Sequence, residues 1–320
     1  MLSEASIIKF FKNEFPDYIG DDAAVIQFSE NESYVITKDL FIEDVHFRIR
    51  YHDAANVGHK ALHVNLSDIA AMGASPMYAM LGIALPVHYA LYADTFIIGF
   101  AKACKASNVI LIGGDTTRSA ERMSISVTLI GKAPESNIKL RSTAKIGDVI
   151  CVIGNLGYAH IGLHYLEKHE PGFDNFKEAF LRPIARVAEG KFLGQMQHIT
   201  SMMDISDGLY LDLNKLCKSS GVGAQIDLDK LHYEKEFKAA CKSLGMECTK
   251  TQLIGGEDYG LLFTVSASEY KEMAQKFCLS FGYTPIIIGE IIKDNCVKFI
   301  HKNVSRSLQL QPFYHFGEIV

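Results

Sequence analysis

Six short segments of the chain place carboxylates beside glycines or at the ends of predicted strands. They are Gly20-Asp-Asp-Ala-Ala24, Thr37-Lys-Asp39, Asn65-Leu-Ser-Asp68, Gly113-Gly-Asp-Thr-Thr-Arg118, Asp204-Ile-Ser-Asp-Gly208 and Gly255-Gly-Glu-Asp-Tyr259. Glycine lets a backbone turn sharply or approach a ligand closely, so a carboxylate beside it is held by a short connection. Convergent carboxylates repel one another unless a cation lies between them. Mg²⁺ is the natural candidate, because it prefers oxygen ligands and keeps waters and phosphates around it.

Asp68 lies in a segment with helical periodicity. At 100° per residue, Val57, Ala61, Val64 and Asp68 fall within about 60° of one another. A carboxylate on an apolar helix face is costly unless it is paired or bound to a metal ion. A helix cap or a buried ion pair would also account for it, but the pattern favours a metal ligand.

The segment Asp204–Gly208 begins like a calcium-binding loop. Position twelve of that loop would be Lys215 instead of glutamate, which excludes an EF-hand. A predicted strand over 199–203 and a predicted helix over 209–219 flank the segment, so its acids lie where ligands of α/β proteins gather. The sequence contains neither G-x-x-x-x-G-K-[ST] nor G-x-G-x-x-G, the usual phosphate-binding loops.

The elements that must position these acids alternate between strand and helix. Strands are predicted at Tyr34–Thr37 and Val109–Ile112, each ending at or just before an acidic motif, and a long helix at Asp53–Met72. A polar segment at 135–147 separates two such alternating halves. We therefore expect an α/β (α+β) chain with two domains, residues 1–135 and 136–320.

Composition excludes several classes of protein. The 320 residues include 48% hydrophobic residues and carry a net charge of −5, which argues against a nucleic-acid partner. No uninterrupted apolar run is long enough to span a membrane, and the first residues do not resemble a signal peptide. Seven scattered cysteines without a C-x-x-C pair are expected to be reduced thiols of a cytoplasmic protein.

Taken in order along nearly the whole chain, the motifs resemble those of the thiamine-monophosphate kinases. The two most specific matches are Ala61–Ala74, which reads A-L-H-V-N-L-S-D-I-A-A-M-G-A, and Gly113–Arg118. Either one alone would indicate only the wider aminoimidazole-ribonucleotide synthetase superfamily. Further matches are Gly20-Asp-Asp22, Thr37-Lys-Asp39, His46-Phe47, Arg141 with Gly147-Asp148, Asp204–Leu209, Gly255–Tyr259 and His315-Phe316.

The resemblance implies a two-domain aminoimidazole-ribonucleotide synthetase-like fold whose N-terminal sheets pair in a homodimer. It implies an enzyme that phosphorylates thiamine phosphate to thiamine diphosphate by direct in-line transfer from ATP, with several Mg²⁺ ions. By the same resemblance the metal positions are Asp22, Thr37, Asp39, Asp68, Asp115, Asp204 and Asp207. The ATP positions are Gly114, Asp115, Arg141 and Ser206, and the substrate positions are His46, Glu257 and Phe313. Lys38 departs from the pattern, because a hydroxyl residue is expected there.

Two alternatives stay open at this stage. One is another ATP-dependent enzyme of the same superfamily, acting on an aminoimidazole precursor, selenide or a carbamoylated protein. A selenide enzyme would need a reactive cysteine near the N-terminus, whereas the first cysteine here is Cys104. The other is a nucleotide- or metal-binding regulator without turnover.

Overall fold

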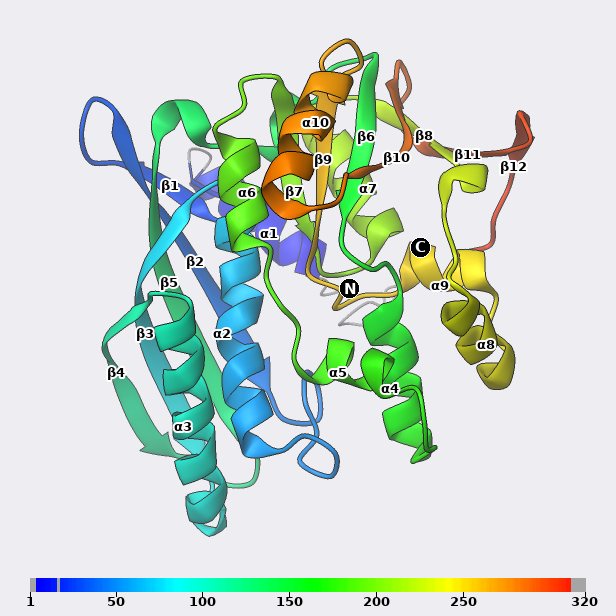
Figure 1. Ribbon diagram of the computed structural model, residues 1–320. Helices are drawn as coiled ribbons and strands as arrows, with labels where there is room; N and C mark the ends of the chain where they lie inside the picture. Colours follow the sequence, from blue (N-terminus) through cyan, green and yellow to red (C-terminus); the bar gives the residue numbers. More distant parts are fainter. Residues whose placement is uncertain (1–3, 16–17, 312–320) are drawn as a thin grey trace.

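The chain folds into two mixed β-sheets with helices packed around them (Figure 1). The computed structural model describes residues 4–15 and 18–311. The first sheet has the order β1-β2-β5-β3-β4 and the second β12-β11-β8-β10-β6-β9-β7. Within the described residues, β3 pairs with β4 and β11 with β8 in parallel, and the other strand pairs are antiparallel. The expected α/β architecture in two units is confirmed, while the pairing of two chains stays a prediction.

The strands of the first sheet precede residue 135 and those of the second follow residue 147. The first set is β1 Ala24–Gln27, β2 Glu32–Ile42, β3 Ser75–Leu85, β4 Ile110–Arg118 and β5 Ser124–Pro134. The second set is β6 Asp148–Ile153, β7 Ile199–Ile205, β8 Gly223–Asp227, β9 Gly260–Ser266, β10 Ile286–Ile292, β11 Val297–His301 and β12 Val304–Arg306.

The helices cover the faces of these sheets and fill the space between them. They are α1 Glu4–Glu14, α2 Ala54–Ala71, α3 Ala90–Ala106, α4 Tyr158–Lys168, α5 Asp174–Leu181, α6 Val187–Gly194, α7 Leu209–Ser220, α8 Lys235–Leu244, α9 Cys248–Ile254 and α10 Tyr270–Phe281. Short 3₁₀ turns lie at η1 Val87–Tyr89, η2 Glu135–Asn137, η3 Arg141–Thr143 and η4 Leu228–Lys230.

Helix α2 is the element that joins the two units. Asp53 caps its first turn by accepting a hydrogen bond from the backbone N–H of Asn56 at 2.9 Å. Toward the first sheet, α2 contributes Leu62 and Leu66 to one apolar core, and near its end Ala70 belongs to a core of the second unit. The helix is therefore buried on most sides, and any polar side chain on it must find a partner within the protein.

Two glycines allow α2 and α3 to lie side by side (Figure 1). A Cβ atom on Gly58 would lie 2.4 Å from the backbone oxygen of Phe96, and one on Gly99 would lie 2.2 Å from that of Ala55. Since neither clash can be relieved without moving backbone, glycine is required at both crossing points. This packing holds α2 against the sheet that carries Thr37 and Asp39.

Two strands run further than the sequence predicts. The strand predicted at 34–37 continues as β2 to Ile42, so Asp39 lies within the strand. The strand predicted at 109–112 continues as β4 to Arg118, so the G-G-D-T-T-R motif is itself a strand. Placing Asp39 and Asp115 at strand ends was wrong, and for Asp115 the reason is that Gly113 and Gly114 were read as turn signals. A Cβ atom on Gly114 would lie 1.9 Å from the backbone oxygen of Leu81, so close approach to β3 is what requires this glycine.

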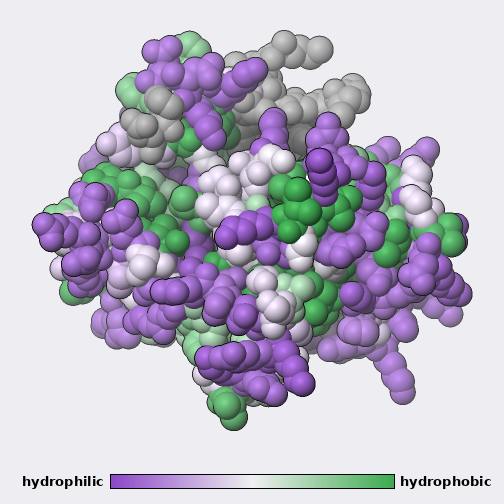
Figure 2. Space-filling view, turned by 90° about the horizontal axis from the view of Figure 1, so that it is seen from above, coloured by the Kyte–Doolittle hydropathy of each residue, from purple (hydrophilic) through white to green (hydrophobic). Residues whose placement is uncertain are grey.

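No helix among the described residues is both long and apolar enough to cross a membrane. The face in Figure 2 is mainly hydrophilic, with apolar residues in separate groups.

Two buried histidines of the first unit make the fold sensitive to acid. Burial, the largest cause, lowers the pKa of both His52 and His63 to about 3, from an ordinary value of 6.5. Below pH 6.5 the unfolded chain therefore binds more protons than the folded one, and stability falls as the pH falls. Between pH 7.5 and 5 we expect a loss of about 2 kcal/mol for each histidine.

Urea unfolding of the wild type and of His52→Phe at the two pH values measures this effect. The difference between the two proteins isolates the contribution of His52 from that of the carboxylates, which are common to both. We expect His52→Phe to lose about 2 kcal/mol less than the wild type on acidification. Identical pH dependence in both proteins would show that His52 is not the acid-sensitive group.

Candidate active site

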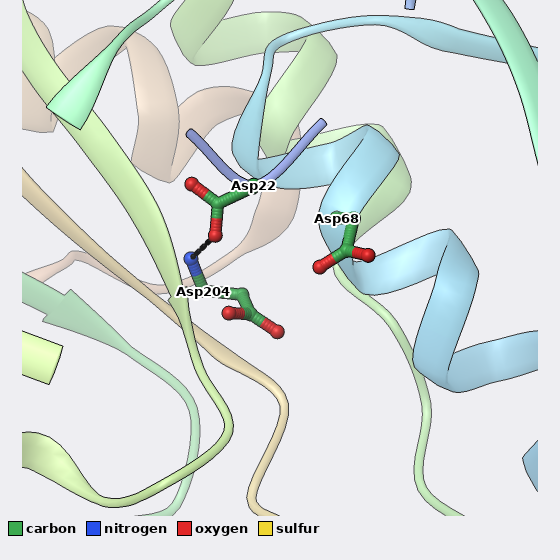
Figure 3. Close-up of side chains that lie close together, drawn as sticks. All are labelled: Asp22, Asp68 and Asp204. Carbon is green, nitrogen blue, oxygen red and sulfur yellow. Dashed lines mark hydrogen bonds between the residues drawn. The ribbon is translucent and has the colours of Figure 1, made fainter. Parts of the chain in front are cut away.

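Three aspartates from distant parts of the chain meet between the two units (Figure 3). Asp22 precedes β1, Asp68 lies on α2, and Asp204 lies near the end of β7. One carboxylate oxygen from each lies within 4.8 Å of the others. Asp22 is 9% and Asp204 3% exposed. The sequence-based expectation that carboxylates converge is confirmed for these three.

The charges of this cluster are only partly compensated. Burial, followed by repulsion from neighbouring aspartates, raises the pKa of Asp68 and of Asp204 well above the ordinary value. Burial also raises the pKa of Asp39, which lies near enough to act on Asp68, to about 6. Such a site favours a bound cation over three free carboxylates.

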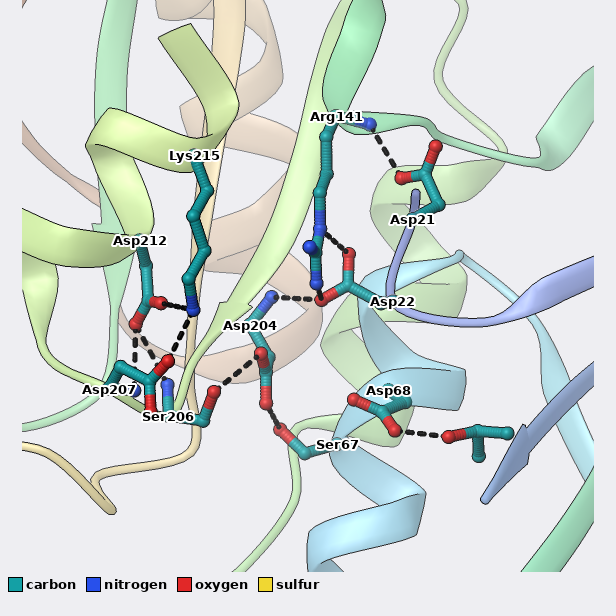
Figure 4. A network of polar contacts seen from close by, with 11 residues as sticks. Asp21, Asp22, Ser67, Asp68, Arg141, Asp204, Ser206, Asp207, Asp212 and Lys215 are labelled. Carbon is teal, nitrogen blue, oxygen red and sulfur yellow. Dashed lines mark hydrogen bonds and ion pairs between the residues drawn. The ribbon is translucent and has the colours of Figure 1, made fainter. Parts of the chain in front are cut away.

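Hydroxyl groups orient the carboxylates of Asp68 and Asp204 (Figure 4). Thr37 on β2 donates a hydrogen bond to Asp68, and Ser67 donates one to Asp204 at 2.9 Å. Ser206 donates to the other oxygen of Asp204 at 3.3 Å. Oxygen ligands held by short polar contacts at the junction of several elements suit Mg²⁺, so the donor set fits the ion that the resemblance implies.

Arg141 is committed to Asp22 in this structure. Its Nε donates to Oδ2 of Asp22 at 2.9 Å, its Nη2 donates to Oδ1 at 2.7 Å, and its backbone N–H donates to Asp21 at 2.8 Å. Burial alone would lower the pKa of Arg141, but the Asp22 carboxylate outweighs it and the pKa is raised. This two-bond pair fixes the Asp21-Asp22 turn against η3 and leaves Arg141 at the edge of the acid cluster.

Asp207 is held apart from the three-carboxylate cluster by a network that sequence reasoning missed. Lys215 on α7 pairs with Asp207 and, at 2.9 Å, with Asp212. Asp212 also accepts the backbone N–H groups of Ser206 and Asp207, each at 3.0 Å. The sequence feature that could have revealed this network is the D-x-x-K spacing of Asp212 and Lys215 in the first turns of α7. This spacing puts both side chains on the helix face next to the Asp204–Gly208 motif.

Two of the substrate positions predicted from the resemblance, His46 and Glu257, have contacts apart from the three aspartates. The His46 ring accepts the backbone N–H of Ile42 at 3.0 Å and lies 5.5 Å from the Phe41 ring. Glu257 accepts a hydrogen bond from Lys60 of α2 at 2.6 Å. Lys60 is fully buried and was not singled out from the sequence, because a lysine in an apolar helix is normally a solvated residue.

Gly114 and Asp115 do not join the cluster within one chain. They lie on β4, the edge strand, whose residues are all exposed. Three strand spacings separate β4 from β2, roughly 14 Å across the sheet.

Phe313, the third substrate position that the resemblance implies, lies outside the described residues.

Lys38 extends from the sheet face opposite to Thr37 and Asp39. Its neighbours in β2 are buried or half-buried, whereas Lys38 itself is exposed. Its ammonium donates to Ser126 at 2.6 Å and to Thr128 at 3.4 Å. Because side chains alternate along a strand, Lys38 cannot contact the same site as Thr37 and Asp39.

Comparisons with known proteins agree with this arrangement. Residues 20–133 match the family described as AIR synthase related protein, N-terminal domain, and residues 145–302 match AIR synthase related protein, C-terminal domain. The thiamine-monophosphate kinase of Buchnera aphidicola (from Acyrthosiphon pisum) is 36% identical over 314 residues, covering 92% of this chain and 95% of that protein. The thiamine-monophosphate kinase of Bacillus subtilis is 32% identical over 322 residues, covering 93% of each.

A solved structure described as AaThiL complexed with AMPPCP and TMP is similar over almost the whole chain. It aligns with a TM-score of 0.87 at 30% identity and covers 98% of this chain and 97% of that one. The sequence identity, the two matching domains and the shared fold lead to one conclusion: the chain belongs to the thiamine-monophosphate kinase family of AIR synthase-related proteins.

Proposed function

We propose that this protein transfers the γ-phosphoryl group of ATP to thiamine phosphate, giving thiamine diphosphate. The observation that carries the proposal is the buried cluster of Asp22, Asp68 and Asp204 at the junction of the two units. Family membership supports the choice of substrate, and a similar structure is described as a complex with AMPPCP and TMP. Two polyanions must meet for this reaction, so compensating their charge is the main task of the site.

Magnesium suits that task. The residues that would hold it are Asp22, Thr37, Asp39, Asp68, Asp115, Asp204 and Asp207, and it would neutralise the phosphate oxygens during transfer. Gly114, Asp115, Arg141 and Ser206 would contact ATP. His46, Glu257 and Phe313 would contact the thiamine part of the substrate.

The chain's own residues act mainly by positioning. A terminal oxygen of thiamine phosphate is already anionic near neutral pH, so no general base is assigned. That oxygen would attack the γ-phosphorus in line, without a covalent intermediate on the enzyme. Arg141 stands beside the cluster, where a guanidinium can pair with phosphate oxygens.

We also propose that the working enzyme is a homodimer in which Asp115 of one chain serves the site of its partner. Asp115 is exposed on the edge strand β4 and is separated by the sheet from the cluster of its own chain. Ile110 and Ile112 on the same strand are 61% and 53% exposed, which favours a partner along this edge. Residues 1–135 would then supply the dimer contact and most metal positions, and residues 136–320 would complete the nucleotide and substrate site.

The direct test incubates the purified protein with ATP, Mg²⁺ and thiamine phosphate and separates the products. We expect thiamine diphosphate and ADP in equal amounts. Parallel reactions replace thiamine phosphate with selenide, an aminoimidazole precursor or a carbamoylated peptide. ATP consumption with one of these and none with thiamine phosphate would assign the protein to another branch of the superfamily, and no ATP consumption at all would favour a regulator.

A further inference from the structure

Lys60 is a buried lysine to which the proposed function assigns no role. It lies on α2, its side chain is 0% exposed, and its ammonium donates to Oε2 of Glu257 at 2.6 Å. The ammonium also lies 3.7 Å from the centre of the Phe180 ring and 6.0 Å from that of Phe41. Burying an ammonium is costly, and a carboxylate and aromatic faces are the groups that offset the cost.

The backbone around Glu257 is fixed independently of Lys60. Glu257 has a φ of 64°, a left-handed conformation that is uncommon for a residue with a side chain. Its N–H donates to the backbone oxygen of Ser206 at 2.7 Å, and the N–H of Tyr259 donates to that of Ile205 at 2.9 Å. Asp258 accepts the N–H of Gly157 at 2.6 Å. Glu257 is therefore anchored beside the Asp204–Asp207 segment, while its side chain stays 25% exposed.

Two other cations near the site already have carboxylate partners. Arg141 pairs with Asp22, and Lys215 pairs with Asp207 and Asp212. Among the described residues, Lys60 is the cation that pairs with Glu257. Lys60 is fully buried and contacts Oε2, whereas the Glu257 side chain is 25% exposed, so part of that side chain stays accessible to solvent.

We propose that Lys60 is a positioning residue, which holds the Glu257 carboxylate in place so that it accepts a hydrogen bond or a positive charge from the thiamine part of the substrate. The chemistry that such a carboxylate recognises is an amino group or a cationic heteroaromatic ring, and thiamine phosphate carries both. The proposal rests on the proposed function. The proposal goes beyond that function because it makes the affinity for thiamine phosphate, but not the affinity for ATP, depend on Lys60, a residue that contacts neither substrate.

The test compares Lys60→Met, Glu257→Gln and the double variant with the wild type, using KM for each substrate and calorimetric binding of thiamine phosphate. We expect Lys60→Met to raise KM for thiamine phosphate about 10- to 100-fold, as for the loss of a charge-assisted contact. KM for ATP should change less than about threefold, because ATP contacts other residues. In the Glu257→Gln background, Lys60→Met should have little further effect, since the two side chains act as one unit.

Lys276→Met is the matched control. Lys276 also pairs with a glutamate at 2.6 Å, but both side chains are more than half exposed on α10, so no kinetic constant should change. If Lys60→Met does not fold, the double variant, which buries no unpaired charge, replaces it, and its constants should equal those of Glu257→Gln.

Equal increases in KM for both substrates would overturn the proposal, and so would additive effects of the two substitutions. A wild type that forms no thiamine diphosphate and does not bind thiamine phosphate would instead refute the proposed function, and the role of Lys60 with it. Normal wild-type turnover combined with an unchanged KM in Lys60→Met would refute the role of Lys60 alone.

Discussion

Asp68→Asn lowers kcat by at least about 10³-fold and leaves the fold intact, if the carboxylate cluster is the metal centre. Asp68 lies on α2, a capped helix with mostly buried residues, and asparagine keeps its size and can still accept the hydrogen bond of Thr37. The substitution removes the negative charge of Asp68 next to Asp22, Asp39 and Asp204, and this charge is needed to bind a cation. Steady-state kinetics at saturating Mg²⁺ measures the effect.

Thermal unfolding separates this loss from a loss of stability. Because neighbouring carboxylates repel Asp68, the metal-free variant should melt no lower than the metal-free wild type. Added Mg²⁺ should raise the melting temperature of the wild type more than that of the variant. Asp174→Asn, at an aspartate whose side chain is 90% exposed, is the control and should leave activity unchanged. Near-normal turnover in Asp68→Asn would refute the metal assignment.

Asp115→Asn should also abolish turnover, although Asp115 lies roughly 14 Å across the sheet from β2. The physical reason is that a partner chain would bring this carboxylate to the cluster. Each single variant alone is then expected to be inactive. Mixed dimers made by refolding Asp68→Asn and Asp115→Asn chains together contain one site with both aspartates intact.

An equal mixture should therefore recover about a quarter of the wild-type activity, because half of the dimers are mixed and each has one intact site. If Asp115 served its own chain, every site in the mixture would lack one aspartate and no activity would return. Size-exclusion chromatography of the wild type gives the accompanying measurement, and an active monomer would contradict the dimer proposal.

Prediction from the sequence was reliable for features that a single helix, strand or turn determines by itself. Helix 54–71 was predicted almost to the residue, because Asp53 caps it and its apolar face follows a helical period. The strand-to-helix turn at Asp204–Leu209 was recognised for similar reasons. The convergence of Asp22, Asp68 and Asp204 followed from their placement at such turns and on the apolar helix face.

Features that depend on tertiary packing could not be obtained in this way. Gly114 was read as a turn residue, but it allows β4 to approach β3 within a continuous strand. Lys60 and Glu257 are 197 positions apart, so no local pattern joins them. The position of Asp115 away from the cluster depends on strand order, which the spacing of motifs does not encode.

The central claim is that the carboxylate cluster supports direct phosphoryl transfer from ATP to thiamine phosphate, and one labelling measurement tests it. A single turnover with γ-³²P-labelled ATP, thiamine phosphate and Mg²⁺ should place the label in thiamine diphosphate in step with ADP formation. Chelation of the metal should stop both, and no label should remain on the protein. Label released as inorganic phosphate, or retained on the protein before thiamine diphosphate forms, would contradict the account.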